Sequence, residues 1–273
     1  MKFTPSDNLY SSFQRTAKIV GYFSITTGSL VLIGWAFDIS IFKSVFPHFA
    51  SMKSMTAFLF ILCGLWILLP NNLKKIFPIS IASIVSLIGL LVLIQYLFSL
   101  DFGIDRIFFY DSSEKIFPGR MAPSSAFIFF IIGFAMIIVD TLKKQWIIDT
   151  FVLISFLISA LAVYRYIFGV SSLYQISIFT SVAIHTSITF LLICVGILLK
   201  YPDKGIMQII SSNHSGGTIL RRVLPYILLI PPLLAWLRIK GQEFGYFDTT
   251  FGIIILTIGN TIIFTLELLQ NKK

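Results

Sequence analysis

The segment from residue 76 to residue 99, IFPISIASIVSLIGLLVLIQYLFS, decides the fold class of this chain. It contains no Asp, Glu, Lys or Arg, and about 20 mostly apolar residues are enough for a helix to cross a bilayer. Seven further apolar segments lie at 17–37, 54–70, 121–139, 147–168, 179–199, 219–238 and 249–268. We therefore expect an all-α integral membrane protein with eight transmembrane helices.

The composition agrees with this fold class and excludes others. The chain has 273 residues, of which 56% are apolar and 12% are charged, whereas a soluble domain carries about 25% charged residues. This hydrophobicity also excludes disorder. The net charge of +9 does not indicate a nucleic-acid partner, because the basic residues separate apolar runs instead of forming one patch. We expect membrane lipids as partners, with the basic residues attracted to anionic headgroups.

The distribution of Lys and Arg predicts the orientation. With eight spans, both termini and their connecting loops share one side, which receives 13 of the 21 basic residues. Basic residues favour the cytoplasmic side, so both termini are expected to be cytoplasmic. The expected domains are a cytoplasmic segment at 1–16, a transmembrane domain at 17–268 and a cytoplasmic exit at 269–273.

A unit of two helices recurs along the chain. An aromatic residue closes one span, and the next span opens with a small hydroxyl residue followed four positions later by Phe. The three clearer copies have Trp35, Thr56 and Phe60; Tyr96, Ser125 and Phe129; and Tyr166, Thr186 and Phe190. A fourth and weaker copy has Trp236 and Arg238, followed by Asp248-Thr249-Thr250. We expect four repeated α-hairpins.

The repeated residues and nearby cations suggest a pocket at the outer mouth. The second helix of each hairpin starts on the outer side, where helix N-termini carry partial positive charge. Such a mouth favours an anionic or carbonyl-bearing small ligand. The candidate ligand-binding residues are Trp35, Lys53, Thr56, Arg120, Ser125, Arg165, Tyr166, His185, Thr186, Trp236 and Arg238. Helix packing by the small residues and snorkelling of the cations to headgroups are the alternatives.

Catalytic and metal-binding patterns are not evident. The spacing of Asp101, Asp105 and Asp111 matches no calcium loop, and we interpret these residues as solvated loop acids. The three histidines suggest no metal or haem site, and no enzyme motif occurs. We expect no catalytic residues, no metal and no cofactor.

Several motifs resemble one bacterial family. They include Phe102-Gly103-Ile104-Asp105, Pro118-Gly119-Arg120-Met121-Ala122-Pro123, Gly169-Val170-Ser171-Ser172-Leu173-Tyr174 and Ser215-Gly216-Gly217 with Leu220-Arg221-Arg222-Val223-Leu224-Pro225. Over about residues 20–270 the chain is similar to the multi-pass membrane sensory region that precedes PAS, GAF, histidine kinase and diguanylate cyclase modules. The resemblance implies a sensory input role in the bacterial inner membrane, in signal transduction of the two-component type.

The expected function is therefore a membrane-embedded, receptor-like sensor of a small ligand or of the membrane state at the periplasmic side. No catalytic output domain is recognised, so we expect either a stand-alone input module or a separate kinase or cyclase as output partner. The sequence leaves open whether the chain forms a homodimer. The alternative is a transporter or channel for a small solute, which the proline-rich span 219–238 favours and the lack of a midplane ionisable cluster disfavours.

Overall fold

The computed structural model describes residues 7–46, 50–109, 111, 117–139, 145–169, 182–212 and 214–270. All regular elements in these ranges are helical. In chain order they are α1 (Asp7–Ala36), α2 (Ser40–Lys43), α3 (Ser54–Leu68), α4 (Ile76–Leu97), the 3-10 helix η1 (Ile104–Arg106), α5 (Pro123–Ile138), α6 (Gln145–Phe168), α8 (Ile184–Lys200), α9 (Gly205–Ile210), α10 (Ser215–Glu243) and α11 (Thr249–Gln270).

Each of the eight expected apolar segments overlaps one of the longer helices. Four of these helices are long and apolar enough to cross a membrane, namely those at Asn8–Ala36, Ile76–Leu97, Gln145–Phe168 and Gly216–Glu243. The other four apolar stretches, at Ser54–Leu68, Pro123–Ile138, Ile184–Lys200 and Thr249–Ile262, are shorter. The chain is thus an all-helical protein whose helices are suited to a membrane.

The helix bounds differ from the expected ranges where a helix includes polar residues or where apolar residues are not helical. α1 begins at Asp7 and not near residue 17, because its polar first turns continue the same helix. α8 begins at Ile184 and not at 179, since Ala183 is extended with φ −69° and ψ 151°. The turn expected at 169–178 lies, apart from Gly169, outside the described residues.

The chain divides into two compact units. The bundle unit comprises Asp7–Met207, and the hairpin unit begins at Gln208. The division falls inside the range 17–268 that the sequence suggests as one domain. In the hairpin unit α10 packs against α11, and α10 remains a single helix through Pro225, Pro231 and Pro232.

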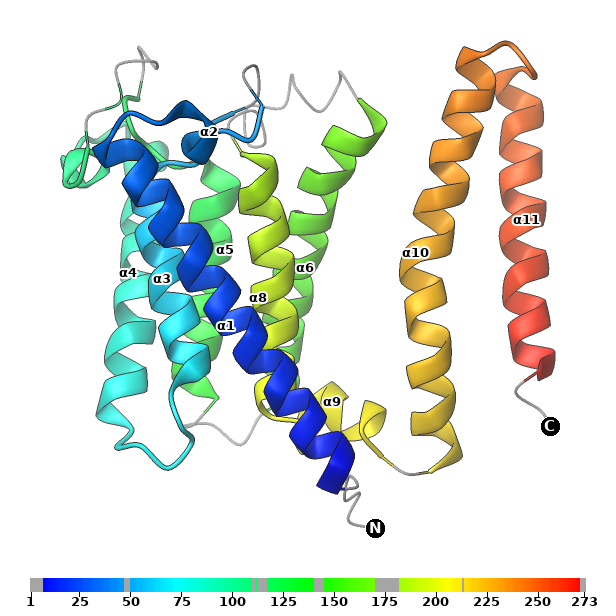
Figure 1. The fold of residues 1–273 in the computed structure, drawn as a ribbon, viewed down its shortest axis with the longest axis horizontal. Helices are drawn as coiled ribbons and strands as arrows, with labels where there is room; N and C mark the ends of the chain where they lie inside the picture. The colour runs from blue at the N-terminus through cyan, green and yellow to red at the C-terminus, as the bar shows by residue number, and fades with distance from the viewer. Residues whose placement is uncertain are drawn as a thin grey trace. The chain divides into compact units, whose positions relative to one another are not determined.

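The bundle unit consists of three antiparallel helix pairs. α1 packs against α3, α4 against α5 and α6 against α8, and α8 also contacts α1, α3 and α5 (Figure 1). α3, α5 and α8 carry large shares of buried residues. The core of the bundle therefore lies among the second helices of the three pairs.

Glycines bring the helices of two pairs into backbone contact. A Cβ atom on Gly28 of α1 would lie 2.4 Å from the carbonyl oxygen of Ala57 in α3. A Cβ atom on Gly89 of α4 would lie 2.6 Å from the backbone nitrogen of Phe130 in α5. Such close approach through small residues is the usual way in which helices associate without a hydrophobic driving force.

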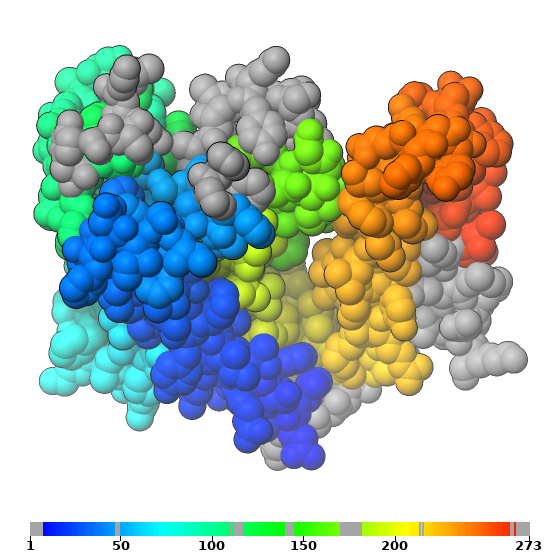
Figure 2. Space-filling view, turned by 45° about the horizontal axis from the view of Figure 1, so that its top comes forward, coloured from blue at the N-terminus to red at the C-terminus, as the bar shows by residue number. Residues whose placement is uncertain are grey.

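The two ends of the bundle unit differ in their polar groups. We call the end where α1 stops and α3 starts the α2 end, and the opposite end the Asp7 end; Figure 2 turns the α2 end toward the viewer. At the α2 end Ile41 and Phe46 are exposed, as expected for a segment at a membrane interface. At the Asp7 end the buried Lys200 donates to the carbonyl oxygens of Trp66, Ile67 and Leu69 at 2.8, 2.9 and 2.6 Å, and so satisfies the C-terminal carbonyls of α3.

Candidate functional site

Three aromatic side chains at the α2 end bind the chain just before the next helix. In each pair the aromatic residue of the first helix donates a hydrogen bond to the backbone carbonyl two positions before the first residue of the second helix. The bonds run from Trp35 Nε1 to Met52 at 2.9 Å, from the Tyr96 hydroxyl to Met121 at 3.0 Å and from the Tyr166 hydroxyl to Val182 at 2.7 Å. Because the acceptors precede helices, these bonds fix how each second helix enters the bundle.

Three phenylalanines meet in the middle of the bundle unit. Phe60, Phe129 and Phe190 come from α3, α5 and α8 and are at most 1% exposed. Their ring centroids are 5.3 Å apart for the first two, 4.8 Å for Phe60 and Phe190, and 4.7 Å for Phe129 and Phe190. The phenylalanines of the sequence pattern therefore pack against one another in the core and do not line an open cavity with their rings.

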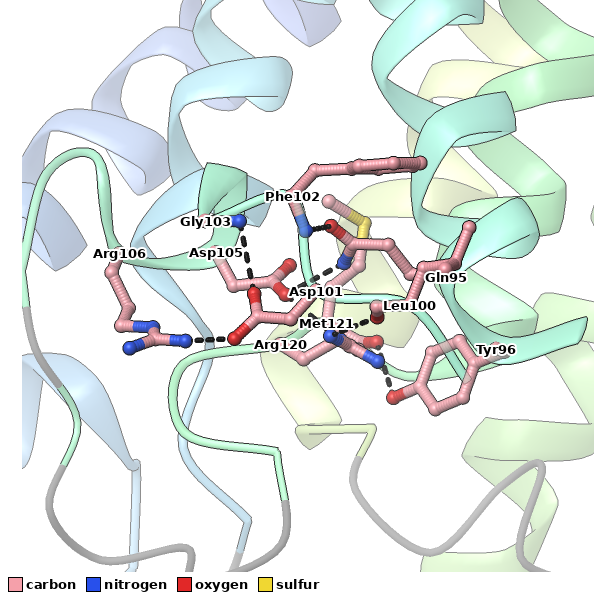
Figure 3. Close-up of polar contacts among 10 residues, drawn as sticks. All are labelled: Gln95, Tyr96, Leu100, Asp101, Phe102, Gly103, Asp105, Arg106, Arg120 and Met121. Atoms are coloured by element: carbon pink, nitrogen blue, oxygen red, sulfur yellow. Dashed lines mark hydrogen bonds and ion pairs between the residues drawn. The ribbon is translucent and has the colours of Figure 1, made fainter. Parts of the chain in front are cut away.

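A buried ionic cluster lies beyond the end of α4. Asp105 Oδ2 accepts hydrogen bonds from Arg120 Nε at 2.8 Å and from Gln95 Nε2 at 2.7 Å (Figure 3). Gln95 Oε1 in turn accepts from the Phe102 backbone nitrogen at 3.0 Å, and Arg120 Nη2 donates to the Leu100 carbonyl at 3.2 Å. The cluster ties the two ends of the connection between α4 and α5 to each other and to Gln95 of α4.

Local geometry positions this cluster. Gly119 has φ +76°, and a Cβ atom there would lie 2.7 Å from the carbonyl oxygen of Asp105. Only glycine fits this close approach and this left-handed conformation without strain. The Arg120 guanidinium also lies 4.5 Å from the Phe117 ring centroid. The turn at 117–120 thus delivers Arg120 to Asp105.

An exposed ion pair lies in the same connection. Arg106 Nη2 pairs with Asp101 Oδ2, and the two side chains are 44% and 49% exposed. Asp101 Oδ1 also accepts from the Gly103 backbone nitrogen at 2.9 Å. This backbone bond, followed by the charges of Arg106 and Arg120, holds the pKa of Asp101 below its usual value.

A second buried ion pair connects distant parts of the chain. Lys53 Nζ lies 2.6 Å from Asp111 Oδ2, and their side chains are 4% and 5% exposed. Lys53 is the residue directly before α3. The interpretation of the loop acids as solvated is therefore wrong for Asp105 and Asp111, which are both buried; it holds for the exposed Asp101.

The remaining candidates at the α2 end surround the start of α8. Arg165 is 1% exposed and donates from Nη2 to the Val182 carbonyl at 3.0 Å. Both ring nitrogens of His185 and the hydroxyl of Thr186 are buried and have no hydrogen-bond partner among the described residues. Pairing these atoms would need a polar group other than those of the described residues.

The structure brings nine of the candidate residues to the α2 end of the bundle unit, at or near the starts of α3, α5 and α8. Trp236 and Arg238 belong to α10 in the hairpin unit, where Arg238 Nη2 donates to the Thr249 carbonyl at 3.3 Å. Two of the cations expected to attract an anion, Lys53 and Arg120, are already paired with carboxylates. Among the described residues, no group of three or more His, Cys, Asp or Glu could hold a metal ion.

Sequence reasoning missed Gln95 and Asp105 as members of the ionic cluster and Asp111 as the partner of Lys53. Gln95 offers the clearest available signal, since it is the one strongly polar side chain in the segment 76–99 and is 0% exposed. Comparisons of the chain with protein-family models, curated proteins and solved structures found no match.

Proposed function

We propose that this chain is a membrane-embedded sensor that detects a small ligand or the membrane state at the α2 end. The observation that carries the proposal is the buried ionic cluster of Gln95, Asp105 and Arg120. Buried ion pairs add little to stability compared with apolar packing, but breaking one is costly. A connection held by such pairs has two distinct arrangements, held or released, and a signal needs that kind of bistable element.

The cluster also gives the signal a physical route. Lys53 stands directly before α3 and Arg120 three residues before α5, so a displaced connection between α4 and α5 would pull on the starts of two core helices. Those helices meet through Phe60, Phe129 and Phe190. A polar ligand near His185 and Thr186, or a change in lateral pressure on the exposed apolar residues of this end, is the proposed stimulus.

The proposal includes eight membrane crossings, of which the shorter ones need an explanation. α3 has 15 residues and rises about 23 Å, less than the hydrocarbon thickness of about 30 Å. Residues 51–53 before it are not helical and add about 10 Å if extended. Met52 and Lys53 are 1% and 4% exposed, and irregular backbone is tolerated at membrane depth when protein buries it.

We also propose that the hairpins are copies of one unit. The support is the equivalent position of the three aromatic-to-carbonyl hydrogen bonds and of the three core phenylalanines. The fourth copy, in α10 and α11, rests on the sequence alone. In the orientation proposed from the basic residues, the α2 end is periplasmic, both termini are cytoplasmic and the membrane is the bacterial inner membrane. A separate kinase or cyclase as output partner follows only from the family resemblance.

The test couples the full chain to a measurable output. The chain is joined upstream of a histidine-kinase output with a transcriptional reporter, and cells are exposed to small carboxylates, to phosphates and to agents that change membrane fluidity. Reporter output should respond to one of these, and Arg120→Gln and Arg165→Gln should each abolish the response while expression is retained. Arg106→Gln, which breaks only the exposed pair, is the matched control.

Two outcomes would overturn the proposal. One is a response that Arg120→Gln and Arg165→Gln leave unchanged. The other is the absence of any response together with solute flux into liposomes that contain the purified chain, which would favour the transporter or channel.

A further inference from the structure

A cavity of about 360 Å³ opens at the Asp7 end of the bundle unit, opposite the ionic cluster. Its walls come from α1, from the end of α3 with the turn that follows, and from the end of α8. The lining residues are Gln14, Ala17, Lys18, Ile67, Leu68, Leu69, Pro70, Asn71, Asn72 and Lys200. The volume is in the range of small-molecule sites.

The cavity is positively charged. Two of its described lining residues, Lys18 and Lys200, are cations, and none is acidic. Lys200 is 6% exposed, and its three carbonyl acceptors hold its ammonium group in place. The nearby acidic residue Asp203 is not part of the described lining and lies close enough to interact with Tyr10. The Tyr10 hydroxyl accepts a hydrogen bond from Nε2 of the lining residue Gln14 at 3.2 Å. A fixed, buried cation beside a flexible, exposed one suits an anion that enters from the surface.

The cavity is also amphipathic. Amide side chains of Gln14, Asn71 and Asn72 offer donors, whereas Ile67 and Leu68 supply apolar wall. A second, smaller cavity of about 80 Å³ shares Lys200 and Asn71 and adds Lys75. Basic pockets between membrane helices on the cytoplasmic side bind lipid headgroups.

We infer that this cavity binds a phosphate-bearing anion, with the headgroup of an anionic phospholipid or free phosphate as its source. Lys18 and the amides contact the phosphate, and Lys200 supplies a permanent positive charge behind it. The inference rests on the proposed membrane orientation but not on the sensing role, and the site is distinct from the ionic cluster at the α2 end.

The test measures binding to the full chain in uncharged detergent by calorimetric titration. The three probes are dihexanoyl phosphatidylglycerol, zwitterionic dihexanoyl phosphatidylcholine and inorganic phosphate. Binding of phosphatidylglycerol alone supports a lipid headgroup, and binding of inorganic phosphate as well supports a site for the phosphate group itself. Equal binding of the anionic and zwitterionic lipids, or binding of none of the probes, overturns the inference.

Lys18→Gln tests the location. Removing one lysine next to an anion should weaken binding about fivefold, and Asn72→Asp should weaken it as well by adding a negative charge at unchanged size. Arg15→Gln is the matched control, since Arg15 is an exposed cation of α1 outside the described lining. Lys200 is not substituted, because its loss would leave the C-terminal carbonyl groups of α3 without their hydrogen-bond donor. An affinity that Lys18→Gln and Arg15→Gln change equally would overturn the assignment.

Discussion

Replacing Asp105 by Asn should destabilise the bundle unit far more than the same change at Asp101. Both carboxylates lie between α4 and α5, and both pair with an arginine. The side chains of the Arg120–Asp105 pair are 3% and 4% exposed, whereas those of the Arg106–Asp101 pair are 44% and 49% exposed. Loss of one partner from a buried pair costs about 3–5 kcal/mol, and an exposed pair contributes about 0–1 kcal/mol.

The difference between the two variants should therefore be about 2 kcal/mol or more. Unfolding of the purified chain by titration with sodium dodecyl sulfate, followed by tryptophan fluorescence and circular dichroism, measures it. The double variant Asp105→Asn/Arg120→Gln removes both charges and should be less destabilised than Asp105→Asn alone, because no buried charge is left uncompensated. If Asp105→Asn costs no more than Asp101→Asn, the ionic cluster does not hold the connection in place.

Three further predictions concern packing and pH. Gly89→Ala should cost about 1–3 kcal/mol, because its Cβ atom would meet backbone atoms of α5. The same unfolding titration measures this, with Gly216→Ala as control, because a Cβ atom there would meet no described atom within 4 Å beyond its own helix backbone and chain neighbours. Phe60→Ala should cost about 3 kcal/mol by opening a cavity between the core rings, whereas Phe98→Ala at a 69% exposed site should cost little. The hydrogen bond from a backbone N–H, with the nearby arginine charges, lowers the pKa of Asp101 in the folded protein. The stability that ionised Asp101 contributes to the connection between α4 and α5 is therefore present above its unfolded-state pKa and is lost as the pH falls through the lower folded-state value. Limited proteolysis should show this connection loosening in acid, and Asp101→Asn should abolish that pH dependence.

The apolar segments predicted where the helices lie, because hydrophobic runs of this length are a local property of the sequence. The recurring order of an aromatic residue, a hydroxyl residue and Phe also indicated three residues that bind carbonyls at the α2 end and three that meet in the core. The segments did not predict where helices begin when polar turns or extended residues adjoin them, as at Asp7 and Ile184.

The burial of the loop acids could not be predicted in this way. Lys53 and Asp111 are 58 positions apart, and nothing in the local sequence of either identifies the other as its partner. Asp101 and Asp105 are both acids in one connection, yet one is exposed and the other is buried. The difference arises from the turn at Gly119, whose close approach to the backbone of Asp105 is a tertiary feature.

The contact of Phe60, Phe129 and Phe190 makes the three helix pairs mechanically interdependent. Each ring touches the other two, so no pair can tilt or slide alone without opening a void that the remaining two border. A disturbance that enters through one connection is thereby shared among all three, and the bundle would move as a concerted body rather than hairpin by hairpin.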